Sequence, residues 1–381
     1  MKTHPWLLIA ALAIPVACDS GGGDGDTDGG SSTSTTTAST TASTTATTAT
    51  STTTTAGSTT DAPTTEADGS STGEPGTGSS TGEGSGSTST GEAIQEVSIQ
   101  FAARVGDAEA NCTDSYEGVG SNATGDESYT ITFRDLRFYV SEIRLVNGAG
   151  EEVALELEQD GQWQVENVAL LDFEDGSGAC TSGTVETNTV VVGTVPADDY
   201  TGVLFQIGVP YDLNHTDVNT AEAPLNDIAM NWNWLNGRKF VKIDINTDND
   251  VASGGSSAVD QWNVHLGSIC GMENPMTPPE SEDQCMRPGR PQVSLDAFDP
   301  TVDTIVADVA ALLDGVNIAE NVGANPGVVG CQSIPPADND MFKGQQITDC
   351  DDLWANWGMD WATGDCEGSC EGQTFMSVQS K

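Results

Sequence analysis

Val97-Ser-Ile-Gln-Phe-Ala-Ala-Arg-Val105 is the stretch that decides the fold class, because its apolar side chains alternate with more polar ones. A period of two is typical of a half-buried β-strand. Further expected strands cover residues 129–133, 136–140, 143–146, 189–195, 200–209, 240–245 and 258–266. Because short turns separate them and no regular alternation with helices occurs, we expect a mainly β fold: an antiparallel β-sandwich or barrel-like domain with a few short helices.

Three helices are expected within this fold. Asp299-Pro300 supplies a cap and a first-turn proline, and apolar residues at helical spacing then run to Gly315. A second, short helix is expected around residues 350–357. The third candidate, residues 225–235, lies between a proline and a glycine and carries Trp232 and Trp234. On a helix these two side chains would point about 160° apart.

The amino terminus has the features of an export signal. A short basic start is followed by an apolar run over residues 6–17, too short to span a membrane, and then by Cys18. A small residue directly before a cysteine resembles the bacterial lipoprotein cleavage box. We therefore predict a lipoprotein signal peptide over residues 1–17 and a lipid on Cys18; the alternative is an ordinary signal peptide with an incidental cysteine.

Residues 19–93 are almost entirely Ser, Thr, Gly, Ala and acidic residues. Such a segment cannot bury enough apolar surface to offset its ordering entropy. We expect residues 18–93 to be a lipidated cysteine plus a disordered stalk, with an end-to-end distance of about 50 Å. The folded domain is then residues 94–381.

The chain is strongly acidic, with 12 basic against 58 acidic residues and a net charge of −46. This charge argues against nucleic acid or anionic membrane surfaces as partners, so contact with a membrane is expected through the lipid anchor only. No other stretch is long and apolar enough to cross a bilayer. The acidity favours cations and basic partners, although it also serves solubility.

The chain has nine cysteines, of which eight remain if Cys18 carries lipid. An even number in an exported chain predicts disulfides, although eight cysteines allow 105 connectivities. Neighbourhood in the sequence favours local loops closed by Cys270–Cys285 and Cys366–Cys370, and we pair Cys112 with Cys180 and Cys331 with Cys350. A metal thiolate pair at Cys366 and Cys370 is a less favoured alternative, since thiols are usually consumed as disulfides in an oxidising compartment.

Candidate catalytic groups are scarce. His4 would leave with the signal peptide, so the mature chain has two histidines, His215 and His265. No Ser-His-Asp or Cys-His arrangement, phosphate loop or His-Glu-x-x-His motif is present, and we predict that the protein is not an enzyme. On the expected strand, His265 lies on the face opposite Trp262 and Val264. Imidazole suits copper, zinc or nickel, but a lone histidine is more often structural.

Asp244-Ile-Asn-Thr-Asp-Asn-Asp250 places oxygen side chains at alternate positions, as calcium loops do. The glycine and the glutamate that an EF-hand loop requires are missing. We interpret this stretch as a solvated acidic turn and consider calcium an unlikely cofactor.

Several short segments of the folded part resemble one known family in order and spacing. They are Phe101-Ala-Ala-Arg-Val-Gly106 with Cys112, Phe133-Arg-Asp-Leu-Arg-Phe-Tyr-Val140, Val168-Ala-Leu-Leu-Asp-Phe-Glu-Asp175 with Cys180, Gly208-Val-Pro210, Leu213-Asn-His215, Ala223-Pro-Leu-Asn226, Met230-Asn-Trp-Asn-Trp234, Lys239-Phe240 and Val264-His-Leu-Gly267 with Cys270. The family is the MbnP-like proteins, four-cysteine-motif copper-binding proteins paired with di-haem MauG-type peroxidases. The resemblance covers about residues 97–375.

The resemblance implies an extracytoplasmic copper-binding protein. A partner di-haem peroxidase would convert one tryptophan to kynurenine, which helps to build the metal site. An indole N–H is a donor only, whereas the aryl amine and ketone of kynurenine can ligate a metal. The resemblance assigns the copper-ligand role to His215 and His265 and the modification to Trp232 or Trp234. The alternative function is a stalked surface adhesion or glycan-binding or calcium-binding β domain without copper.

Overall fold

The computed structural model describes residues 93–381 except 123, 182, 234–236, 254–257, 271–280, 283–284, 286, 322–329, 334–349 and 367–369. All of these residues belong to one compact unit, Ser85–Lys381. The predicted signal peptide, the lipidated Cys18 and the predicted stalk lie outside the described residues. Within the described part, no helix is long and apolar enough to span a membrane.

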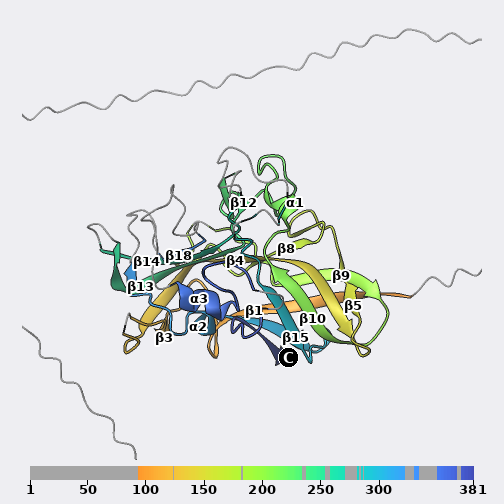
Figure 1. Ribbon diagram of the computed structural model, residues 1–381, viewed down its shortest axis with the longest axis horizontal. Coiled ribbons are helices and arrows are strands. Elements are labelled where there is room, and N and C mark those ends of the chain that lie inside the picture. Colours follow the sequence, from red (N-terminus) through yellow and green to blue (C-terminus); the bar gives the residue numbers. More distant parts are fainter. Residues whose placement is uncertain are drawn as a thin grey trace, which may run out of the picture. The chain divides into compact units, whose positions relative to one another are not determined.

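A large mixed sheet forms the body of the domain (Figure 1), and its strands run in the order β15-β10-β4-β13-β14-β18. Its central strand is β4, which pairs with both β10 and β13. Five further strands join this sheet at β4, β8 and β13. The bounds are β3 Tyr116–Val119, β4 Tyr129–Asn147, β5 Glu152–Ala154, β7 Gln164–Val165, β8 Val168–Asp172, β10 Tyr200–Ile207, β13 Val241–Ser253, β14 Ala258–Leu266, β15 Gln292–Asp296, β17 Glu320–Asn321 and β18 Cys331–Gln332.

A second, smaller sheet has the order β19-β16-β1-β9-β6, with β2 paired to β1. Its bounds are β1 Ile94–Val105, β2 Ala108–Glu109, β6 Glu156–Leu157, β9 Val190–Pro196, β16 Asp303–Asp308 and β19 Met376–Ser380. The two sheets contribute to one apolar core, in which the rings of Phe101 from β1 and Phe205 from β10 lie 5.9 Å apart. The predicted mainly β fold is confirmed, with most pairings antiparallel and three parallel ones, β1–β16, β13–β17 and β14–β18.

Two expected helices are wrong. Residues 303–308 form β16, which is hydrogen-bonded to β1 on one side and β19 on the other, and only α2 (Val309–Leu312) follows it. The apolar spacing fits a helix, but two ladder partners satisfy the backbone of the β-branched run Thr304-Ile-Val306. Residues 225–235 form turns and then β11 (Asn231–Asn233), which pairs with β12 (Gly237–Arg238). The expected short helix at 350–357 is confirmed as α3 (Asp351–Asn356).

The expected acidic turn at residues 244–250 is also wrong, because β13 runs through it. Asp244 lies opposite Asp135 in the ladder with β4, and Asp248 accepts a hydrogen bond from the backbone N–H of Thr130 (3.0 Å). Pairing with β4 and β14 therefore holds this polar stretch in extended conformation despite its poor strand propensity.

Four disulfides staple the described domain, and they join the four pairs of cysteines that were expected from the sequence. They are Cys112–Cys180, Cys270–Cys285, Cys331–Cys350 and Cys366–Cys370. Cys331 lies in β18, and its partner Cys350 directly precedes α3, so this bond joins the edge of the large sheet to the C-terminal segment.

A long excursion, residues 208–240, connects β10 to β13 and carries α1 (Tyr211–Asn214), β11 and β12. Figure 1 shows α1 and β12 beside each other, on the opposite side of β4 from β1. The Tyr139 hydroxyl of β4 donates to the Pro224 carbonyl (2.9 Å), and Arg137 pairs with Asp227 (2.8 Å). The excursion therefore covers the face of the large sheet that is turned away from the small sheet.

Candidate metal centre

The covered face of the large sheet carries a row of buried polar side chains. Lys242 lies opposite Arg137 of β4 on one side and opposite His265 of β14 on the other. Asp244 lies two residues farther along β13, opposite Asp135. Because residues two apart on a strand share a face, these five side chains form one polar layer across three strands.

Ion pairs run through this layer from one end to the other. The Arg137 guanidinium donates to both oxygens of Asp135 (2.8 and 2.5 Å). Lys242 donates to Asp135 as well, and its Nζ lies 3.5 Å from Asp244 Oδ2. At the other end, Arg137 also reaches Asp227 of the excursion. Buried charges are tolerated only when they are paired in this way.

His265 lies at the end of the layer, and its Nε2 is 2.6 Å from Asp244 Oδ1. Both side chains are 11% exposed, so water competes little for this contact. Burial raises the pKa of Asp244, but the hydrogen bond from His265 and the charge of Lys242 are among the contacts that outweigh it and lower the pKa to about 2. Asp244 is therefore a carboxylate at neutral pH.

Asn214, the last residue of α1, joins the second histidine, His215, to the segment that follows β14. Its amide oxygen accepts from the Arg238 backbone N–H (2.7 Å), and its amide nitrogen donates to Ser268 Oγ (2.8 Å). The same nitrogen lies 3.4 Å from Nε2 of His215. His215 is half-buried and its ring lies 4.9 Å from that of Tyr211. His215 is thereby placed beside the chain just after β14.

Trp232 reaches the same place from β11. A Cβ atom built on Gly267 would lie 2.5 Å from Cζ3 of Trp232 and 2.9 Å from the Arg238 carbonyl oxygen. The indole ring therefore occupies the space in which a side chain at position 267 would lie. Gly267 follows His265 by two residues, so Trp232 packs over the continuation of the strand that carries His265.

The structure thus brings His215 and Trp232 to Gly267 and Ser268, directly after the His265 strand. Trp234 lies outside the described residues. Because β11 is a strand, the argument that helical geometry separates the two tryptophans no longer applies. Imidazole is a ligand type that suits copper, whereas an unmodified indole is a hydrogen-bond donor only.

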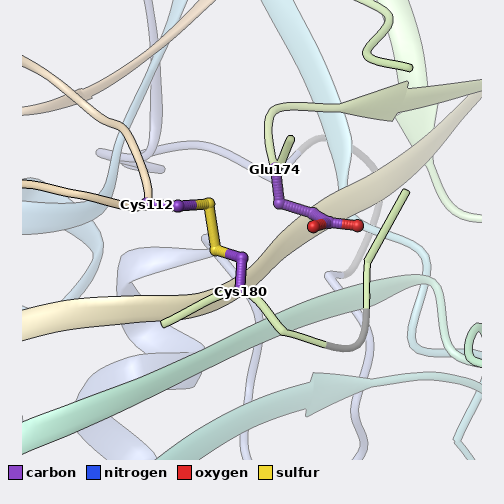
Figure 2. A group of neighbouring side chains, drawn as sticks. All are labelled: Cys112, Glu174 and Cys180. Atoms are coloured by element: carbon purple, nitrogen blue, oxygen red, sulfur yellow. A yellow bond between two sulfur atoms is a disulfide. The ribbon is translucent and has the colours of Figure 1, made fainter. Parts of the chain in front are cut away.

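A different group of metal-ligating residue types meets elsewhere in the described part of the chain. A Glu174 carboxylate oxygen and the sulfurs of Cys112 and Cys180 lie within 4.8 Å of one another. Figure 2 shows that the two sulfurs are bonded to each other, with Glu174 beside them. A disulfide offers no thiolate, and Glu174 accepts from the backbone N–H groups of Gly176 and Thr184 (3.2 Å each), so this group is structural.

Buried carboxyls also lie beyond the Arg137 end of the polar layer. Burial raises the pKa of Asp172 to about 8, although the charge of Arg137 lowers it. Burial likewise raises the pKa of Glu174, against the charge of Arg137. The Asp172 carboxyl is thus largely protonated at neutral pH, which reduces the charge buried beside Arg137.

The MbnP family model matches residues 94–333, a region that includes every described residue of the candidate centre. The chain belongs to the MbnP family. Among solved structures, MbnP from Methylosinus trichosporium is similar with a TM-score of 0.60 and 28% sequence identity. That likeness covers 76% of this chain and 99% of the other chain. No curated protein matches the chain.

The MbnP match ends at residue 333, before α3 and β19. β19 pairs with β16 at the edge of the smaller sheet, and α3 buries Leu353 and Trp354 in the core; neither element carries a residue of the candidate centre. The MbnP region therefore holds the centre, and the C-terminal segment completes the core.

The sequence did not assign a role in the centre to three of its residues, Asp244, Asn214 and Gly267. The alternation in residues 240–245 places Lys242 and Asp244 on one face, and the alternation in 258–266 does the same for His265. Only the register between β13 and β14 joins the two faces. Asn214 and Gly267 stand in segments that carry the family resemblance, but the role of each depends on a contact with a distant segment, which no local pattern indicates.

Proposed function

We propose that this protein is an extracytoplasmic copper-binding protein, not an enzyme, whose metal site uses His215, His265 and a kynurenine formed from Trp232. The observation that carries the proposal is the packing of Trp232 over Gly267, where the excursion that holds His215 meets the strand that holds His265. Membership of the MbnP family supports the same reading.

The chemistry supports a modified tryptophan as the third ligand. An indole has one N–H donor and no lone pair to give to a metal. Insertion of two oxygen atoms from peroxide, through the partner peroxidase, would open the pyrrole ring to N-formylkynurenine. Hydrolysis by water would then release the formyl group as formate and leave an aryl amine and a ketone. With two imidazoles, this completes a low-coordinate site of the kind that Cu(I) accepts. A partner di-haem peroxidase of the MauG type would supply the oxidation. Trp234 is the alternative target.

The proposal includes export and tethering. A lipid on Cys18 would hold the domain to a membrane through residues 19–93, facing the periplasm or the cell surface. Two or more acyl chains are sufficient for stable attachment. The site would then lie in the compartment where its disulfides form and where an exported haem partner can reach Trp232.

The test is to produce the full chain with and without a di-haem peroxidase and to measure bound copper and peptide masses. We expect copper in the co-expressed protein, and a Trp232 peptide that has gained one oxygen and lost one carbon. Trp232→Phe should lose both, whereas Trp361→Phe, in the C-terminal segment outside the MbnP match, should lose neither. Co-expressed protein with no copper and no mass change would refute the proposal. A mass change confined to Trp234 would show that Trp234, and not Trp232, is the modified residue.

A further inference from the structure

Asp244 holds His265 with little freedom to turn. Its Oδ1 takes the contact with His265 Nε2 (2.6 Å), and its Oδ2 lies 3.5 Å from Lys242 Nζ. In the orientation that its neighbours require, the Asn263 amide nitrogen donates to the same Oδ1 (3.2 Å). A carboxylate held by three neighbours keeps its position, and the imidazole bonded to it keeps its ring orientation.

The contact also decides which ring nitrogen carries the proton. Both oxygens of Asp244 face donors, Lys242 at Oδ2 and the Asn263 amide nitrogen at Oδ1, so they act as acceptors and Nε2 of His265 is the donor. In a neutral imidazole the other nitrogen, Nδ1, then has the lone pair, and only a nitrogen with a lone pair can bind a metal.

The restraint on Asp244 continues into the segment that carries Trp232. Lys242 is held by Asp135, Asp135 by Arg137, and Arg137 by Asp227. Asp227 lies in the excursion, five residues before Trp232. One chain of ion pairs therefore spans from His265 to the excursion, and it links the orientation of the imidazole to the docking of the tryptophan segment.

We propose that Asp244 is a positioning residue for the copper site: it fixes His265 as the Nε2–H tautomer, so that His265 binds copper through Nδ1. This inference rests on the proposed function, because it assigns an atom to a ligand of that site. Partners of metal-bound histidines typically change metal affinity by about 10–100-fold when they are mutated.

The experiment uses the full chain with ¹⁵N-labelled histidine, with the His265→Gln variant to assign the signals. In metal-free protein, we expect the long-range ¹H–¹⁵N spectrum to show His265 protonated at Nε2. Adding Cu(I) to the co-expressed protein should shift the Nδ1 signal. Asp244→Asn should remove the tautomer preference and weaken Cu(I) binding by about 10–100-fold, and Asp244→Glu should restore part of both.

Asp248→Asn is the matched control. This substitution also removes one negative charge from β13, but the Asp248 side chain is exposed and accepts a hydrogen bond from the backbone N–H of Thr130. In this variant, the tautomer of His265 and the affinity for Cu(I) should stay as in the wild type. Copper bound through Nε2 of His265, or an Asp244→Asn protein with unchanged tautomer and affinity, would overturn the inference and leave the proposed function standing. A wild-type protein that binds no copper would overturn both.

Discussion

Arg137 and Phe138 are neighbours in β4, yet they meet opposite environments. Phe138 points into the core, where its ring lies 5.7 Å from those of Phe173 and Phe375. Arg137 points to the covered polar face and pairs with Asp135 and Asp227. One face of the large sheet is therefore apolar and packs against the core, and the other is charged and is covered by the excursion, residues 208–240.

The two faces differ in what they contribute. Burial of apolar side chains is the main stabilising term in folding. A buried ion pair is weak evidence for stability, because desolvation offsets much of its attraction. A role in the candidate site explains the polar face better than a role in stability does, because this face holds His265 and docks the segment that carries Trp232. We infer that the core face mainly stabilises the fold and the polar face mainly orients the site.

The largest effect is expected from Phe138→Ala. Loss of a fully buried aromatic side chain should reduce the free energy of unfolding by about 3–5 kcal/mol. Because Phe138 is on the face away from the centre, copper affinity of the folded protein should stay unchanged. Urea denaturation and Cu(I) titration measure the two quantities. Ile228→Ala, at a side chain that is 75% exposed, should change stability by less than about 0.5 kcal/mol.

Arg137→Met removes the central cation of the polar face while keeping much of its volume. It should cost about 3 kcal/mol, because Asp135 stays buried without its bidentate partner. Unlike Phe138→Ala, it should also weaken Cu(I) binding, since the chain from Asp227 to Asp244 is broken. The control is Arg144→Met, whose exposed pair with Glu152 should contribute less than about 1 kcal/mol. Unchanged copper affinity in Arg137→Met would contradict the division between the faces.

Gly267→Ala tests the contact that brings Trp232 to the His265 strand. The new methyl group would lie 2.5 Å from the indole ring, so the tryptophan must move. We expect a loss of about 1–3 kcal/mol and a lower yield of kynurenine after co-expression, measured by denaturation and by peptide mass. At Gly148 a methyl group would meet nothing within 4 Å, so Gly148→Ala serves as the control. An undiminished kynurenine yield would show that the Gly267 contact does not position the modified residue.

The smallest effect, taken per pH unit, is a pH dependence set by Asp172. Its pKa is about 8 in the folded protein against an ordinary value of 3.8, so the folded state keeps a proton that the unfolded chain releases. Stability should therefore fall as pH rises from about 4 to 8, and Asp172→Asn should reduce that slope by up to about 1.4 kcal/mol per pH unit. Denaturation midpoints from pH 5 to 8 measure it.

Asp175→Asn is the control for this titration, because hydrogen bonds from Ser177 lower the pKa of Asp175. Its titration lies below the measured window, so the slope should match that of the wild type. Glu174 keeps part of the slope in Asp172→Asn, because its pKa is also raised by burial. An unchanged slope in Asp172→Asn would mean that this carboxyl is already ionised in the folded protein.

Alternation predicted the strands well where one face of the strand is buried. Residues 97–105 and 189–195 became β1 and β9 within a few residues. The helical spacing in residues 299–315 misled, because Val306 is buried on the face of β16 where Thr304 and Asp308 are half-buried, which blurs the period of two. Residues 225–235 misled for another reason, since Asp227 and Leu225 are held by contacts with Arg137 and Arg238 and not by local helix bonds.

The sequence by itself determined the mainly β class, because alternation is a local pattern, and it favoured the two disulfides that close short loops, Cys270–Cys285 and Cys366–Cys370. It also singled out His215 and His265 through the scarcity of histidine, and Trp232 and Trp234 through family resemblance. Only the tertiary structure decided that Asp244 meets His265 and that Trp232 packs on Gly267. Those contacts depend on strand register and on the path of residues 208–240, which join segments that are far apart in the chain and leave no local signal.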